Sequence, residues 1–173
     1  MFIRIKKIKN KEYAYLVKNI WKKRKKASRQ KPHSYLGRVY KLEKTQNNGL
    51  EKDIEKLNAK KITLDLIKLE LLNHGFHEVK NSVFEKDNFK INLTKKEVIN
   101  KKTKKQICLE INNNFFCSYT LKKLVNFTPR QGLTKIQIGR ELANNFEAAG
   151  IIIPKEIFVT IAKKIINQIE TQP

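Results

Sequence analysis

The sequence predicts an α+β protein: a small N-terminal three-stranded β-meander, then a helix, antiparallel β-hairpins and three C-terminal helices. Three observations carry this prediction. Strand-like alternation marks segments of the first 43 residues, and a break follows at Asn47–Asn48–Gly49. Alternation returns between residues 76 and 116, and helical periodicity replaces it after Cys117.

The meander is predicted to contain strands at residues 2–8, 12–21 and 34–43. Asn10–Lys11 supplies the turn between the first two strands. Residues 21–32 are predicted to be a cationic loop that ends at Pro32, because proline cannot donate to a central ladder.

The segment after the break has helical spacing. Leu50, Ile54 and Leu57 recur at helical intervals, Thr63 is a candidate cap for a second segment, and Gly75 can end it. The two segments are either separate helices or one helix with an irregularity between them.

Short strands joined by turns are expected next, at residues 76–79, 82–86, 88–94, 97–101 and 106–116. Asn112–Asn113–Asn114 is interpreted as a strand-to-helix turn.

Three helices are predicted to complete the chain. Ser118 caps the first, and Thr134 caps the second with Gln137 placed for a capping box and Gly150 at its end. Pro154 opens the third, since proline suits a first helical position.

Positive charge is concentrated at the N-terminus. The chain has a net charge of +22, and sixteen of its first 44 residues are Lys or Arg, opposed only by Glu12 and Glu43. We therefore expect two parts, a basic β-module at 1–44 and an α+β body at 45–173.

The basic module predicts contact with a polyanion, because cations neutralise phosphates and interleaved aromatic rings can stack on bases. Tyr13 and Tyr15 are expected mainly to pack, whereas Trp21 suits packing or stacking equally. The candidate nucleic-acid-binding residues are Lys6, Lys7, Lys22, Lys23, Arg24, Lys25, Lys26, Arg29, Lys31, Arg38, Trp21 and Tyr35.

Three functions are compatible with this module. The favoured one is a non-catalytic RNA-binding protein associated with ribosomes or another ribonucleoprotein, with ribosomal or other ribonucleoprotein proteins as further partners. The second is a DNA-binding protein, chromatin-like or regulatory. The third is an accessory subunit that delivers nucleic acid to an enzyme.

The first 43 residues resemble the short β-rich leader of some insertion-sequence transposases. The resemblance rests on Tyr15-Leu16-Val17, on the basic stretch that follows, and on Tyr35-Leu36-Gly37. It implies a shared small module and not a transposase, because no acidic triad can be assigned in the rest of the chain. That remainder is similar in style to archaeal proteins of unknown function.

No catalytic residue, cofactor or metal site is predicted. Cys108 and Cys117 do not have zinc-binding spacing and are interpreted as small buried side chains. The basic run is not on an amphipathic helix, and no apolar stretch has the length of a membrane span, so no membrane partner is expected. The first residues lack the apolar stretch of a secretory signal, which makes the cytoplasm the expected compartment.

Overall fold

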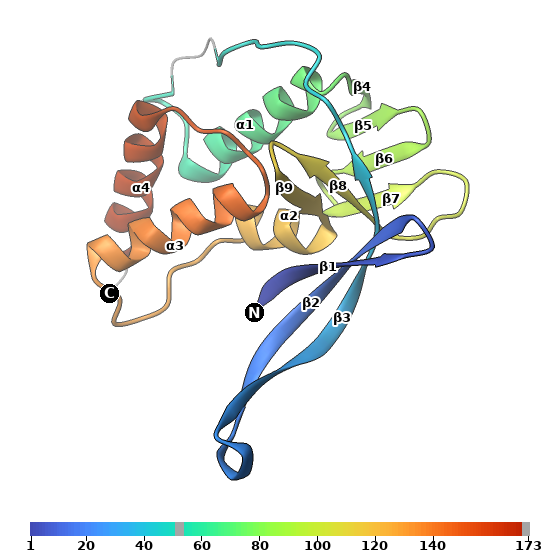
Figure 1. Cartoon of the computed structure of the whole chain (residues 1–173). Helices are drawn as coiled ribbons and strands as arrows, with labels where there is room; N and C mark the ends of the chain where they lie inside the picture. Colours follow the sequence, from blue (N-terminus) through green and yellow to red (C-terminus); the bar gives the residue numbers. More distant parts are fainter. Residues whose placement is uncertain (51–53, 171–173) are drawn as a thin grey trace.

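The computed structural model describes residues 1–50 and 54–170, apart from the side chains of Lys22, Lys25 and Glu170 (Figure 1). The described chain forms four α-helices and nine strands, which confirms the predicted α+β class. The strands are β1 (Phe2–Ile8), β2 (Lys11–Lys22), β3 (Ala27–Lys41), β4 (His77–Lys80), β5 (Val83–Lys86), β6 (Phe89–Asn92), β7 (Glu97–Asn100), β8 (Ile107–Ile111) and β9 (Asn114–Cys117). The helices are α1 (Ala59–Asn73), α2 (Ser118–Val125), α3 (Lys135–Ala148) and α4 (Lys155–Glu170).

The strands form two sheets. One has the order β1-β2-β3-β8-β9, and the other is the antiparallel meander β4-β5-β6-β7. Within the first sheet β3 runs parallel to β8, pairing Arg38–Lys41 with Ile107–Glu110. A parallel pair needs a long crossover, and here α1 and the whole second sheet lie between the two strands. The first sheet therefore continues across the boundary predicted at residue 44.

The two faces of the five-stranded sheet belong to different apolar clusters. The larger cluster joins residues such as Leu109 of β8, Ile62 of α1 and Phe84 of β5. The smaller one lies on the other face and consists of Ala14, Leu16, Leu36, Val39, Cys108 and Cys117. Because strands β2 and β3 contribute most of the smaller cluster, the basic N-terminal residues and the body share a core.

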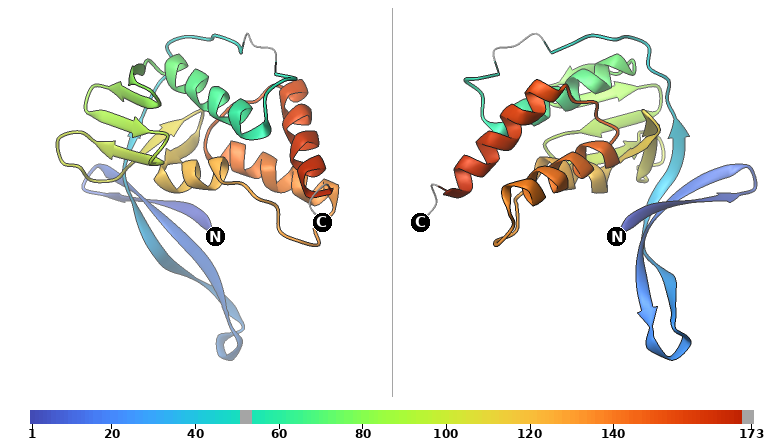
Figure 2. Two further views of the ribbon diagram at one scale, coloured as in Figure 1. Left: turned by 180° about the vertical axis from the view of Figure 1, so that it is seen from behind. Right: turned by 60° about the vertical axis from the view of Figure 1, so that its left-hand side comes forward.

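Strands β2 and β3 extend beyond the body as a two-stranded arm, residues 18–31 (Figures 1 and 2). The predicted loop at 21–32 was therefore wrong, because Lys18↔Lys31 through Lys22↔Ala27 are paired and only the short turn after Lys22 is not. Polar residues occupy both faces of the arm and hide the alternation. Pro32 is tolerated beside a register shift, where β3 has β2 as its one neighbour.

Two tight turns shape the first sheet. Lys9 and Asn10 both have positive φ, as a two-residue type I′ hairpin requires, one residue earlier than predicted. Asn112 and Asn113 form a second such turn between β8 and β9, so the predicted strand-to-helix turn was wrong. Strand β9 then leads directly into α2, with Cys117 in place of Ser118 as the N-cap residue.

The helices agree with the prediction most closely where a capping motif is complete. Thr134 and Gln137 form the capping box of α3, and Gly150 follows its end with φ of +68°. Helix α1 instead begins at Ala59 with Asn58 as its cap, and Thr63 lies inside it. The helix expected at residues 50–57 is absent from the described residues 54–57, and residues 51–53 lie outside the described part.

Gly37 allows the close approach of β3 to β8. Its φ is +129°, and a Cβ placed there would lie 2.5 Å from the carbonyl oxygen of Gln106 and 2.6 Å from Cα of Ile107. Any other residue would force these two backbones apart. The motif Tyr35-Leu36-Gly37 therefore contains the glycine that the parallel β3–β8 ladder requires.

Gly37→Ala is expected to lower the free energy of unfolding by roughly 2–5 kcal/mol, because it adds both backbone strain and overpacking. Gly139→Ala is the control, since no atom lies within 4 Å of the added Cβ in α3. The control should gain about 0.5–1 kcal/mol from helix propensity. Chemical denaturation of both variants measures this, and equal stability of the two would contradict the role of Gly37.

Removal of residues 1–44 is expected to destroy cooperative unfolding, because it takes β3 from the edge of β8 and uncovers Cys108. Replacing residues 18–31 by Asn-Gly, which joins the paired residues Val17 and Pro32, should leave the body folded. Thermal unfolding followed by circular dichroism compares the two. A cooperative transition in the fragment 45–173 at the temperature of the full chain would contradict the shared core.

Candidate nucleic-acid interface

One face of the arm is cationic. Lys18 lies directly opposite Lys31, and Arg29 lies opposite Ile20 on the same face. Like charges at directly opposed positions of an antiparallel pair are destabilising. In the part of the chain that the structure describes, no carboxylate lies within ion-pair distance of these cations. Among the described residues, their repulsion is therefore uncompensated.

The other face of the arm is polar and aromatic. Asn19 and Trp21 alternate along β2, opposite Gln30 and Ser28 of β3. The guanidinium of Arg4 in β1 donates to Oε1 of Gln30, which ties this face to the adjoining strand. Trp21 is 62% exposed, so its ring is open to solvent near the tip of the arm.

A group of tyrosines continues this face at the base of the arm. The ring of Tyr35 lies 6.3 Å from that of Tyr13 and 5.4 Å from that of Tyr15, measured between centroids. The ammonium of Lys6 lies 5.3 Å from the centre of the Tyr15 ring. Partial burial, reinforced by the neighbouring tyrosines, raises the pKa of Tyr35, although half of its surface remains exposed.

Arg38 connects these tyrosines to the body. Its guanidinium lies 4.8 Å from the centre of the Tyr40 ring, which in turn packs 4.9 Å from Phe89 of β6. Cations stacked on aromatic rings keep their charge available while their position is restricted. These contacts attach the base of the arm to β6 of the second sheet.

The predicted residues are distributed along the arm. Trp21, Lys23, Arg24 and Lys26 lie at the tip, Arg29 and Lys31 on the cationic face, and Lys6, Tyr35 and Arg38 at the base. The side chains of Lys22 and Lys25 lie outside the described ones. Lys7 pairs with Glu12 on the face of β1 opposite to Lys6.

Lys18 and Arg4 were not among the residues predicted from the sequence. Both lie in segments predicted correctly as strands, but their importance depends on the residues opposite them, Lys31 and Tyr15. Pairing residues 11–31 as a hairpin would have placed Lys18 opposite Lys31 and so identified it.

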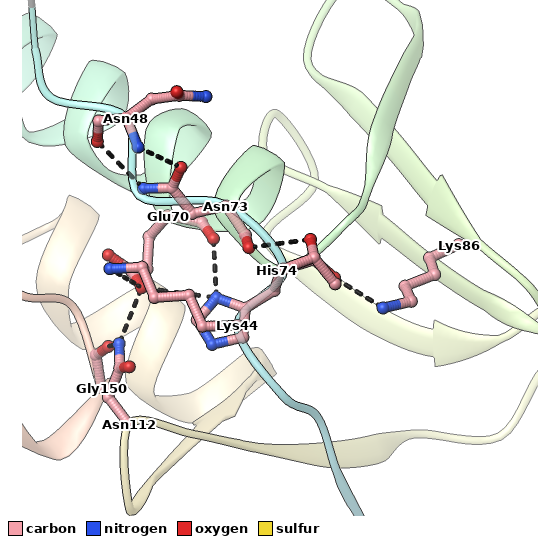
Figure 3. Close-up of polar contacts among 9 residues, drawn as sticks. Lys44, Asn48, Glu70, Asn73, His74, Lys86, Asn112 and Gly150 are labelled. Atoms are coloured by element: carbon pink, nitrogen blue, oxygen red, sulfur yellow. Dashed lines mark hydrogen bonds and ion pairs between the residues drawn. The ribbon is translucent and has the colours of Figure 1, made fainter.

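A buried polar cluster holds the chain that leaves the arm (Figure 3). Glu70 of α1 is 3% exposed, and its Oε1 accepts a hydrogen bond of 2.7 Å from Asn112. The same oxygen lies 3.8 Å from Nζ of Lys44 and 3.3 Å from Nδ1 of His74. A buried carboxylate is tolerated when it is paired and hydrogen-bonded in this way.

Asparagine side chains complete the cluster. Asn73 Nδ2 donates to the carbonyl oxygen of Asn48 at 3.1 Å, and Asn73 Oδ1 accepts from the amide of Asn48 at 3.0 Å. Asn112 also donates to the carbonyl oxygen of Gly150 at 2.8 Å, and Lys86 donates to that of His74 at 2.7 Å. The cluster thus joins the segment after β3 to α1, the β8–β9 turn and the end of α3. We interpret it as structural, because these contacts already occupy its polar groups.

Cys108 and Cys117 are buried, free and directly opposite each other across β8 and β9. The thiol of Cys108 and the helix N-terminus at Thr120 lower the pKa of Cys117. Burial agrees with the predicted packing role. Among the described residues no three His, Cys, Asp or Glu side chains are grouped so that they could hold a metal ion.

Comparison with protein-family models, with curated proteins and with solved structures finds no match. Within the described residues, no helix combines the length and the apolar character that crossing a membrane requires.

Lys31→Glu is expected to stabilise the arm, because it replaces the Lys18↔Lys31 repulsion by a cross-strand ion pair. Hydrogen exchange of the arm amides at low salt should slow by up to about fivefold, the equivalent of roughly 1 kcal/mol. Lys31→Gln, which removes the charge alone, should give a smaller effect. Faster exchange in Lys31→Glu would contradict the described register.

Proposed function

We propose that this protein binds nucleic acid through the arm, with RNA as the preferred ligand, and that the chain itself is not catalytic. One observation carries the proposal: a projecting two-stranded arm with a cationic face, exposed aromatic rings and no acidic residue between Glu12 and Glu43.

The cationic face supports phosphate binding. Lys18 and Lys31 repel each other in the free protein, and a phosphate placed between them would convert that repulsion into two attractions. Each phosphate contact also releases condensed counterions, which makes binding favourable at low salt. The turn after Lys22 adds Lys23, Arg24 and Lys26 at the tip.

The exposed rings favour RNA over a DNA duplex. Trp21 and Tyr35 are 62% and 50% exposed, and flat rings of this kind stack on unpaired bases. Folded RNA offers such bases in loops and bulges, whereas a regular duplex keeps its bases stacked inside. An RNA of a ribosome or another ribonucleoprotein is accordingly the proposed partner, and the cytoplasm the proposed compartment.

DNA is the second candidate, favoured by the form of the arm. A two-stranded β-ribbon fits the major groove of B-form DNA, and side chains of one face would then meet base edges. Asn19 and Gln30, paired on the face that also carries Trp21, are the residues able to make such contacts. The resemblance of residues 1–43 to transposase leaders agrees with this alternative.

Neutralising the cationic face tests the proposal. The triple variant Lys18→Gln, Arg29→Gln and Lys31→Gln should weaken binding to an RNA hairpin and reduce the slope of log K against log salt by about 2–3. The matched control removes three exposed lysines of the body, Lys80→Gln, Lys95→Gln and Lys102→Gln, and changes the net charge equally. Equal slopes in the two triple variants would refute the arm as the binding surface.

The emission of Trp21, the single tryptophan of the chain, reports contact at the tip. Quenching by a hairpin with an unpaired loop, and not by a DNA duplex of equal length, is the result expected for RNA. Tighter binding of the duplex would favour the DNA alternative.

A further inference from the structure

A cavity of about 700 Å³ lies between α2, the connection that follows it and α3. A second cavity of about 360 Å³ shares four residues with the first, Tyr119, Lys123, Asn144 and Asn145. Volumes of roughly 300–1,000 Å³ are typical of sites that hold small ligands. Neither cavity contains any residue of the arm.

The second cavity lies next to the base of the arm. Phe2 of β1 lines it and pairs with Val17, the residue directly before the arm. The N-terminus lies near α2 in Figure 1, in agreement with this placement. A polynucleotide bound along the arm therefore has a short path to the two cavities.

Asn145 carries the observation that points to a ligand. It is 3% exposed, it lines both cavities, and its Oδ1 has no hydrogen-bond partner among the described residues. A buried polar atom without a partner costs free energy, so a native structure that keeps one calls for an explanation. A ligand that supplies the missing partner is such an explanation.

The other lining groups define the chemistry of the ligand. Lys122, Lys123 and Arg130 bring positive charge to the larger cavity, and Glu141 is paired with Arg130. The cavity therefore favours an anion. Tyr119 and Phe127 add flat faces to the same wall. Phosphate, a flat ring and a hydrogen-bonding edge together describe a nucleotide.

The side-chain amide of Asn145 favours adenine among the bases. One donor and one acceptor on the same plane match the N6 and N7 edge of adenine. Arginine is the side chain that matches guanine. The arginine of this cavity is Arg130, and its guanidinium is already paired with Glu141.

We propose that the α2–α3 cavities bind one adenosine monophosphate unit, with Asn145 at the base and Lys122 and Lys123 at the phosphate. The unit is either a free nucleotide or an unpaired adenosine of a bound RNA. The second source rests on the proposed function, and the first does not.

Titration of the full chain with each of the four ribonucleoside monophosphates tests the site. Adenosine monophosphate should bind most tightly, and Asn145→Leu should weaken it about 10- to 100-fold. The melting temperature of Asn145→Leu should be unchanged or higher, because the variant removes an unpaired buried oxygen. Asn81→Leu, at an exposed turn, is the control and should bind as the wild type does.

RNA hairpins with and without a single unpaired adenosine distinguish the two sources. A preference for the unpaired adenosine that Asn145→Leu loses, and that the arm triple variant keeps, supports RNA as the source. Binding of adenosine monophosphate without that preference supports the free nucleotide. If the arm variant binds RNA like the wild type while the nucleotide still binds, the site stands and the proposed function fails.

Photo-crosslinking of 8-azidoadenosine monophosphate uses the wild-type chain alone. Its result therefore does not depend on whether a variant folds. The label should attach within residues 1–3, 114–130 or 141–148, which line the two cavities. Labelling elsewhere, or equal nucleotide affinity in wild type and Asn145→Leu, would overturn the site whatever the arm does to RNA affinity.

Discussion

Four residues of β3, Arg38–Lys41, run parallel to Ile107–Glu110 of β8, and this short ladder joins the arm to the body. It exists because Gly37 lets the two backbones approach where a Cβ would meet the carbonyl oxygen of Gln106. The ladder also places Val39 over Cys108 and thereby closes the smaller apolar cluster. Without it the arm would be a hairpin on a tether. With it, the direction of the arm is determined by the sheet.

Local signals were sufficient for much of the fold. The capping box of Thr134 and Gln137, and Gly150 after α3, were predictable because each lies within a few residues of the structure that it determines. The β3–β8 pairing was not, since the crossover of residues 42–106 separates the two strands in the sequence. The returning strand of the arm, residues 27–31, was missed for another reason: these residues are all exposed and show no apolar period to detect.

The residues of the candidate surfaces also divide into those that local sequence could predict and those that depend on contacts between distant segments. Most cations of the arm could be identified from composition alone, but the opposition of Lys18 and Lys31 depends on the hairpin register. The Glu70 cluster and the unpaired Oδ1 of Asn145 could not be predicted, because their meaning depends on contacts between distant elements. A buried glutamate is recognisable as structural only when Asn112 and Lys44 are seen beside it.

The arm and the body differ in whether their charged side chains stabilise the folded state. In the body, carboxylates such as Glu85 and Glu70 are paired with lysines, and a hydrogen bond from Lys101 lowers the pKa of Glu85. In the described arm, like charges face each other at a cost to the hairpin, and the β2–β3 pairing holds the two strands together against this cost. A protein selected for stability alone gains nothing from that arrangement. It would become favourable if phosphates occupied the cationic face, so the cost in the free state supports the polyanionic ligand that we propose.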